Sequence, residues 1–375
     1  MKKIVLILIF LSLSFSSSFC QYYIGDAERL FLYQQPNARA EALGRGQVTL
    51  HDSPFSIFNN PAAPAFSNGL NVELSHMDPN YPFKKYGFYN TYGITYNMGK
   101  YGSIGFNYLS FSVGDADRTY DAHIADGDYS DHNFNRIYML NYSRQVFHNF
   151  SVGISLNYFY EKLADMYNTQ RGIFYDSYYF DLGLLKRFSF NQSGGNDLYL
   201  GLSLTNAGYS EARGHYFNLQ FPTIMHLGAS YELQINKEDY HGLPPLKLLL
   251  CGEYMDVFET RYFSQVRLGA EATLWEMLKL RIGHWSETLE HDFNESMRTK
   301  LSQFTYGIGV ELPMKRFSKS FLPLTFSLDF TYLPLPDYDD FSYIDPFSDL
   351  IFTDSGFSKY NKSYYILSLN VKVGI

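Results

Sequence analysis

Disulfide chemistry and helical membrane spans are both missing from this sequence. Its 375 residues contain 2 cysteines, Cys20 and Cys251. Cys20 lies in the N-terminal segment described below, so its removal would leave no partner for an internal disulfide. A lone Cys251 within a strand is expected to be a small buried hydrophobe rather than a nucleophile. Beyond residue 20, no run of 18 consecutive apolar residues indicates a transmembrane helix.

Signals for bound polyanions, metals and cofactors are also lacking. The formal net charge is −8, and Lys and Arg do not form the clusters that nucleic-acid binding needs. The sequence contains no His-Glu-x-x-His zinc motif and no glycine-rich phosphate loop that opens a helix. The residues Asp126, Asp128, Ser130 and Asp131 lack the glycine and the closing glutamate of a calcium loop. We therefore predict no enzyme, no cofactor, no metal site and no nucleic-acid partner.

The N-terminus has the order of a secretory signal peptide. Lys2 and Lys3 precede the apolar run 4–15, and a small polar stretch reaches Cys20. The run is shorter than the roughly 20 residues of a transmembrane helix. Cleavage after Cys20 would make residues 1–20 the signal peptide. The alternative, lipidation of Cys20, usually requires a small residue where this chain has Phe19.

Aromatic residues and two-residue alternation are abundant. Tyr and Phe number 34 and 33 and are spread along the whole chain, which disfavours a disordered tail or linker. In the segment 150–160, apolar residues alternate with mostly small or polar ones, and side chains of a strand point alternately to opposite faces. The same pattern recurs, and the strands predicted from it are 70–76, 85–98, 101–113, 132–145, 149–164, 173–188, 197–208, 220–235, 244–256, 263–274, 276–286, 300–312, 321–333 and 363–374.

These strands predict an all-β fold, a transmembrane antiparallel barrel of about 14 strands. Most exceed the roughly 9–11 residues that a tilted strand needs to cross a bilayer, whereas strands of soluble proteins average about 5–6. The even-numbered connections are short, and the longest connections are 114–131, 287–299 and 334–362. Outer-membrane barrels alternate short periplasmic turns with longer external loops in this way. We therefore expect localisation in the outer membrane, with its lipid as a partner.

Charged residues predict which face of the wall is the interior. Arg267 and Glu271 share one face of their strand, and Lys279 and Arg281 share one face of the next, opposite apolar residues. A charge on the lipid face at mid-membrane costs about 2–4 kcal/mol, so these four side chains should face the lumen. They could line a polar passage or form a self-neutralising interior that braces the barrel.

Residues 21–69 do not alternate cleanly and predict an N-terminal hatch or plug before a barrel of residues 70–375. Gly44 and Gly46 permit tight turns, and Asn60-Pro61 favours another. The block Ala38-Arg39-Ala40, then Leu43-Gly44 and Gly46, followed by Asn59-Asn60-Pro61-Ala62, resembles the start of the FadL-like outer-membrane proteins. It is especially similar to their PorV/PorQ-type branch in Bacteroidetes, associated with type IX secretion. The candidate hatch or binding residues are Arg39, Gly44, Gly46, Asn59, Asn60, Pro61 and Ala62.

The resemblance implies fourteen strands behind a hatch and two alternative functions. The first is a PorV/PorQ-type platform for protein secretion or surface attachment, with secretion-system or secreted proteins as partners. The alternative is a FadL-like passive transporter of small hydrophobic compounds. The chain departs from the family at the turn His51-Asp52-Ser53, where the family has two aspartates, and at its non-aromatic end, Val373-Gly374-Ile375.

One pair of residues, His284 and Ser286, has to be weighed as a candidate catalytic site. His284 and Ser286 share the lipid-facing side of one strand, as a histidine and a serine do in outer-membrane phospholipases. The simpler interpretation places both at the wet rim with Trp285 near the interface. No residue on the neighbouring strand is evident to orient the histidine, so the sequence favours the non-enzymatic interpretation.

Overall fold

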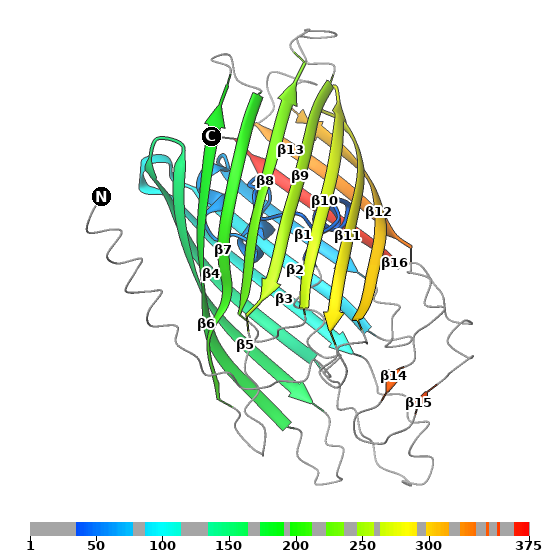
Figure 1. The fold of residues 1–375 in the computed structure, drawn as a ribbon. Helices are drawn as coiled ribbons and strands as arrows, with labels where there is room; N and C mark the ends of the chain where they lie inside the picture. The colour runs from blue at the N-terminus through cyan, green and yellow to red at the C-terminus, as the bar shows by residue number, and fades with distance from the viewer. Residues whose placement is uncertain are drawn as a thin grey trace.

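The chain folds as a closed antiparallel barrel of fourteen strands (Figure 1). The computed structural model describes residues 35–77, 87–113, 134–163, 173–190, 196–211, 223–235, 246–258, 263–290, 298–314, 323–334, 343–344, 351–352 and 364–374. No helix within these ranges is long and apolar enough to cross a membrane. The prediction of an all-β barrel of about 14 strands is confirmed. The predicted signal peptide and the acidic segment 114–131 lie outside the described residues.

Each barrel strand pairs with its neighbours in the chain, and the ring closes between the first and last strands. Leu70 of β1 pairs with Val373 of β16, and β16 pairs in turn with β13. The barrel strands are β1 (Leu70–Met77), β2 (Gly87–Asn97), β3 (Ser103–Val113), β4 (Phe134–Phe147), β5 (Phe150–Leu163), β6 (Ile173–Ser189), β7 (Asn196–Glu211), β8 (Ile224–Gln234), β9 (Leu246–Val257), β10 (Phe263–Leu274), β11 (Leu278–Glu290), β12 (Arg298–Pro313), β13 (Leu324–Leu333) and β16 (Tyr364–Val373).

The tight turns lie at the end of the barrel where β1 begins and β16 ends. The β2–β3 turn contains the short 3-10 helix η4 (Gly99–Tyr101). The β4–β5 and β10–β11 turns contain residues with positive φ, Asn149 at 57° and Trp275 at 51°. We call this the turn end and the opposite end the loop end. A separate small sheet, β14 (Tyr343–Ile344) with β15 (Ile351–Phe352), lies between β13 and β16 in the chain.

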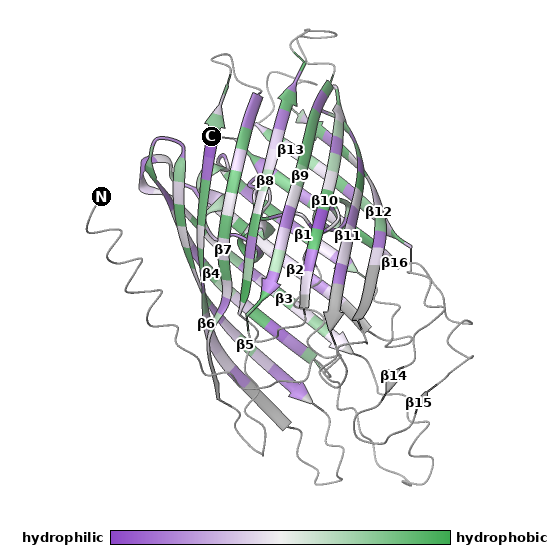
Figure 2. Ribbon diagram, viewed as in Figure 1, coloured by the Kyte–Doolittle hydropathy of each residue, from purple (hydrophilic) through white to green (hydrophobic). Residues whose placement is uncertain are grey.

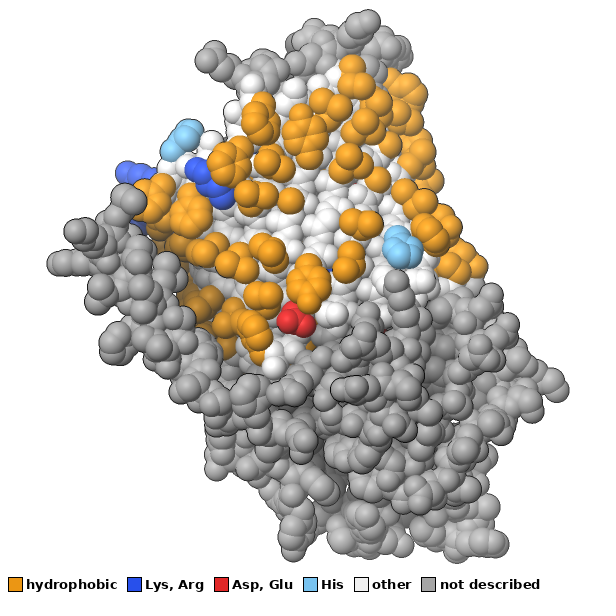
Figure 3. Space-filling view, viewed as in Figure 1, with side chains coloured by type: hydrophobic (Ala, Val, Ile, Leu, Met, Phe, Trp, Pro, Cys, Tyr) orange, Lys and Arg blue, Asp and Glu red, His pale blue; other side chains and the backbone are white. Residues whose placement is uncertain are grey.

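The alternation of the sequence becomes an apolar outer wall and a polar or small inner wall. On β10, Val266 and Leu268 are 49% and 53% exposed on the outside, whereas Arg267 between them is 1% exposed. Figure 2 shows the resulting bands along the strands, and Figure 3 shows apolar side chains over the outer surface of the described wall. This is the arrangement expected when one face meets lipid and the other does not.

One predicted connection overlaps the ends of two strands. The sequence placed a connection at 287–299, but β11 runs to Glu290 and β12 begins at Arg298, with these two residues paired. Most of the extra residues are polar, such as Glu287, Thr288 and Thr299, so they lack the apolar alternation that would have marked them as strand. Cross-strand pairing extends the hairpin beyond its apolar part.

Candidate functional site in the barrel interior

Residues 35–69 lie inside the barrel and form short helical turns. The helix α2 (Ala38–Ala42) is capped by the Asn37 side chain, which accepts a hydrogen bond from the Ala40 backbone N–H at 2.9 Å. Two 3-10 helices follow, η2 (Pro54–Phe58) and η3 (Ala63–Phe66). In Figure 1 these elements appear in blue within the ring of strands. We call residues 35–69 the inner segment; its role as a hatch stays a prediction.

The chain reverses direction after α2 at Gly44, where only glycine fits. Gly44 has φ +63°, a left-handed conformation that side chains disfavour. A Cβ at this position would also overlap the backbone of Leu268 and His284 on the wall. The predicted site residue Gly46 lies beside Cys251, whose Sγ would be 3.3 Å from an added Cβ. The prediction that Cys251 is buried is confirmed.

Glycines of the wall receive the inner segment. A Cβ at Gly153 or Gly183 would overlap Pro61 or Asn60, and one at Gly283 would overlap Gly44. We call the following the wall glycines, because each leaves space that an atom of the inner segment fills: Gly93, Gly105, Gly153, Gly183, Gly201, Gly228, Gly269, Gly283 and Gly307. They come from strands all around the ring, so the segment is seated against the whole circumference rather than against one side.

Replacing a wall glycine is expected to displace the inner segment. In Gly283→Ala the new methyl group would overlap the Gly44 backbone, which cannot yield as a flexible side chain would. Overpacking of this kind costs about 1–3 kcal/mol. Trp285 reports the outcome, since the chain has only one other tryptophan, Trp275, which phenylalanine can replace. We expect greater acrylamide quenching of Trp285 in Gly283→Ala.

The matched control is Gly252→Ala on β9, where the nearest atom would lie at an ordinary 3.4 Å. It should leave the quenching of Trp285 unchanged. Equal quenching in both variants would contradict the tight seating of Gly44 on β11.

Short polar side chains of the wall bind the backbone of the inner segment. Irregular backbone at membrane depth is tolerated only where protein groups satisfy its N–H and C=O groups. The Ser368 hydroxyl accepts from the Ala38 N–H at 2.8 Å, and the side-chain amide of Asn141 donates to the Pro61 carbonyl at 3.0 Å. Ser151 donates to the carbonyl of Ala62 at 2.9 Å. The wall therefore recognises mainly the path of this segment's backbone.

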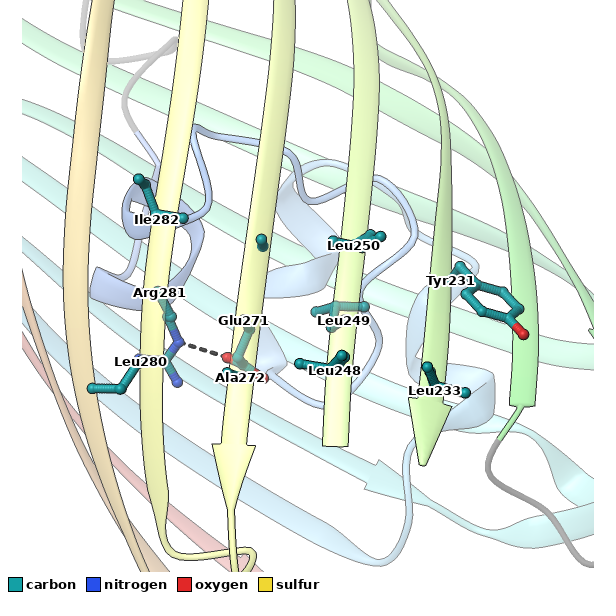
Figure 4. Close-up of a pocket in the computed structure, with 11 residues that line it drawn as sticks. Tyr231, Leu233, Leu248, Leu249, Leu250, Glu271, Ala272, Leu280, Arg281 and Ile282 are labelled. Carbon is teal, nitrogen blue, oxygen red and sulfur yellow. Dashed lines mark hydrogen bonds and ion pairs between the residues drawn. The ribbon is translucent and has the colours of Figure 1, made fainter. Parts of the chain in front are cut away.

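The predicted lumen charges pair with one another and with the inner segment. The Glu271 carboxylate binds the guanidinium group of Arg281 at 2.6 Å (Figure 4). It also binds the guanidinium group of Arg39 at 2.9 Å. Arg281 also binds Asp329 at 2.6 Å, and Lys279 pairs with Glu311. Among these described groups the arrangement is that of a neutralised interior, the second of the two alternatives considered above.

Asp52 extends this network towards the turn end. It pairs with Arg39, and Lys372 lies 3.7 Å away. Burial raises the pKa of the Asp52 carboxyl, but the nearby charges of Arg39, Lys372 and Lys279 outweigh burial and hold the pKa well below its usual range.

A second network centres on Glu253, which the sequence analysis did not single out. One carboxylate oxygen accepts from the backbone N–H groups of Gln47 and Val48, both at 2.8 Å. The other binds Arg267 at 2.7 Å and His226 at 2.8 Å. Two adjacent N–H donors and two basic side chains make this carboxylate a strong anchor of the inner segment.

The remaining predicted site residues hold the turn between η2 and η3. The Asn59 side chain donates to Gln47 at 3.0 Å. The Asn60 side chain donates to the carbonyls of Val48 at 2.8 Å and Leu184 at 3.1 Å, and accepts from the Ala62 N–H at 3.0 Å. These contacts place the motif from Asn59 to Ala62 in a structural role, bonded to the wall.

Trp285 was placed wrongly in the sequence analysis. It is 5% exposed and points inward, with the Arg45 guanidinium 4.4 Å from its ring centre. His284 and Ser286 lie on the outer face, as predicted, and His284 packs on Phe304 with ring centres 4.7 Å apart. Because the strand alternates strictly here, an outward His284 requires an inward Trp285.

Beyond the inner segment, towards the loop end, part of the lumen wall is apolar, whereas other parts carry buried polar side chains such as Gln265 and Glu287. A cluster of inward, almost fully buried side chains lies there, with Leu109 and Ile137 each 1% exposed. Its members from the wall are Met77, Tyr89, Leu109, Phe111, Ile137, Met139, Phe159, Tyr179, Leu333 and Ile366. We call it the apolar layer. The interior thus combines charged and polar networks with an apolar layer that β1–β6, β13 and β16 contribute.

Two cavities lie near the ion pairs. One, of about 360 Å³, opens at the turn end beside Asp52, Asn68 and Lys372. The other, of about 400 Å³, is a depression in the outer wall between Tyr231, Leu250 and Leu280 (Figure 4). Its floor is formed by β10, whose inward Glu271 holds Arg39.

The sequence matches no family model and no curated protein. Solved structures do share the fold. A mutant of the monoaromatic hydrocarbon channel TodX is 12% identical, with a TM-score of 0.50 over 89% of this chain and 97% of that one. The toluene transporter TodX of P. putida is 10% identical, with 0.49 over 91% and 99%. A Pseudomonas aeruginosa FadL homologue is 10% identical, with 0.48 over 91% and 98%. The match with a TM-score of 0.50 shows that this chain shares the barrel fold of that channel.

Proposed function

We propose that this barrel is a passive conduit for small hydrophobic compounds across the outer membrane. The observation that carries the proposal is the apolar layer, which faces the lumen above a tightly seated inner segment. A barrel for hydrophilic solutes needs a water-filled lumen lined by polar groups. An apolar interior instead favours compounds that leave water readily, at about 25 cal/mol for each Å² of apolar surface buried.

The fold adds support, since the structural neighbour with a TM-score of 0.50 is described as a monoaromatic hydrocarbon channel. Its ligand suggests the class of compound to test here, a monoaromatic hydrocarbon such as toluene. Such a compound would enter at the loop end, rest against the apolar layer and pass beside the inner segment. The inner segment is in direct contact with the barrel at the wall glycines, so passage past these positions requires the segment to shift.

The test is uptake of labelled toluene by cells that make the full chain, compared with Leu109→Asn. Leu109 lies in the apolar layer at 1% exposure, and an amide there would have its hydrogen-bonding groups buried. An unsatisfied buried polar group costs about 1–3 kcal/mol, which predicts a fall in uptake of about fivefold or more. Leu109→Met, which keeps volume and polarity, is the control and should transport normally. Unchanged uptake in a correctly assembled Leu109→Asn barrel would refute the proposal.

The PorV/PorQ-type role in type IX secretion and surface attachment is the competing proposal. It rests on the resemblance of the block from Ala38 to Ala62. Purification of the barrel in mild detergent separates the two functions. A secreted protein or secretion component in near-stoichiometric amount would support the platform, whereas a lone barrel carrying a hydrophobic molecule would support the conduit.

A further inference from the structure

Five tyrosines stand side by side on the outer wall. Tyr92, Tyr108, Tyr138, Tyr158 and Tyr178 occupy successive strands from β2 to β6, and each is the direct cross-strand partner of the next. Neighbouring ring centres are 5.0–6.1 Å apart. We call this row the tyrosine ladder. It faces outward, since the flanking residues Leu109 and Ile137 point into the lumen.

The ladder runs obliquely through the membrane. Each strand residue adds roughly 2.5 Å of height, given a rise of about 3.3 Å and a tilt of about 40°. Tyr92 is five residues from the turn end of β2 at Asn97, or about 13 Å up. Tyr178 is eleven residues from the end of β6 at Ser189, or about 28 Å up. An interfacial aromatic girdle would keep one height, whereas this ladder climbs from the apolar band to the outer boundary.

Two basic residues lie just above the upper part of the ladder. Arg136 follows Tyr138 on the outer face of β4, and Lys162 follows Tyr158 and Tyr160 on that of β5. By the same measure both lie about 28–30 Å above the turn end, beyond an apolar band about 25 Å tall. Arg136 stacks over Phe134 at 4.1 Å, which holds its guanidinium at the wall. We call Arg136 and Lys162 the basic pair.

We infer that the basic pair and the tyrosine ladder form a binding site for the phosphorylated glycolipid of the outer leaflet. The cations lie where its phosphates lie, and cationic side chains attract anionic lipid headgroups. The tyrosine rings below them present amphipathic faces to the sugar, because aromatic side chains favour the headgroup level. Leu140 and Leu156, one step lower on the same face, are each 60% exposed and offer an apolar surface to acyl chains.

The cations at the two ends of these strands differ in their surroundings. Asp176 on β6 pairs with Tyr160 in the row above the ladder and with Glu211 on β7, so two acids lie next to the basic pair. The cations nearest the turn end of the same strands, Arg144 and Lys186, lack a tyrosine row beside them. The inference rests on the barrel spanning the outer membrane and not on the proposed transport, so either can fail alone.

The experiment is native mass spectrometry of the full-length barrel in detergent, titrated with purified lipid A. The double variant Arg136→Ala/Lys162→Ala lacks both cations and should bind lipid A about tenfold or more weakly than the wild type. Arg144→Ala/Lys186→Ala removes the same charges from the other end of β4 and β6 and should bind within about twofold of the wild type. Phosphatidylglycerol should compete poorly, because it has no sugar to stack on the ladder.

Three results would overturn the inference. Equal binding of lipid A by both double variants would remove the site from the basic pair. Full displacement by phosphatidylglycerol would make the patch a general anionic-lipid surface. A stable dimer in which a second copy of the chain covers Tyr138, so that lipid A no longer binds there, would assign the ladder to dimerisation. Uptake of toluene is measured separately and should be retained by both double variants.

Discussion

Deletion of residues 35–66 is expected to convert a closed barrel into an open pore. In the intact chain the inner segment contacts wall glycines and hydrogen-bonding side chains around the ring, so we expect it to block the passage of water and ions through the lumen. Barrels somewhat larger than this one form aqueous channels when unplugged. In planar lipid bilayers we expect the full chain to be closed and the deletion variant to pass about tenfold more current or greater.

Two checks keep this result interpretable. Heat-modifiable migration on gels shows whether the deletion variant is a folded barrel. Gly153→Val retains the whole chain but places a side chain on the Pro61 carbonyl, and it should produce intermittent openings. A full-length chain that conducts as steadily as the deletion variant would contradict the seal, and with it the seating of the inner segment.

Removal of the Glu271 carboxylate is expected to cause the largest loss of stability from a single substitution. Glu271→Ala leaves Arg39 and Arg281 without their shared partner in the interior. Removing one member of a buried ion pair costs about 3–5 kcal/mol, because the remaining charge stays desolvated. Urea unfolding of the reconstituted barrel, followed through Trp285, measures the difference. Glu271→Gln keeps hydrogen bonding and should lose less.

The matched control is Glu276→Ala. Glu276 pairs with Lys247 at the β10–β11 turn, where both side chains are about one third exposed, at 31% and 39%. Surface pairs contribute about 0–1 kcal/mol. If Glu271→Ala lowers the free energy of unfolding no more than Glu276→Ala does, the interior network is well hydrated and does not anchor Arg39.

The fold could be predicted because it depends on local alternation. In residues 150–160, apolar residues alternate with mostly small or polar ones, and the structure has strand β5 there. The polar ends of β11 and β12 carry no such signal, and their extent depends on pairing across the hairpin. Closure of the ring is also beyond local pattern, since Leu70 and Val373 are separated by almost the whole barrel.

The interior could be predicted only in part, for a related reason. The face that carries Arg267, Glu271, Lys279 and Arg281 was deduced from the energy of charges in lipid. Their partners were not, because Glu271 meets Arg39 across 232 positions of sequence. Glu253 looks like any inward polar residue of a strand until the backbone of Gln47 is placed beside it. The wall glycines can be found in the sequence, on the face of each predicted strand that was assigned to the interior. Their recurrence on strand after strand indicates space for an inner segment, and the sequence analysis did not use that signal.

The enclosed position of residues 35–69 also bears on how the ring is held closed. Ala38 donates to Ser368 on the last strand, while Asn37 binds Glu73 on the first. The closing seam, β1 with β16, therefore forms around a segment that contacts both of its edges. We therefore expect the inner segment to stabilise this seam, because it bridges the two strands that must pair last along the chain to close the ring.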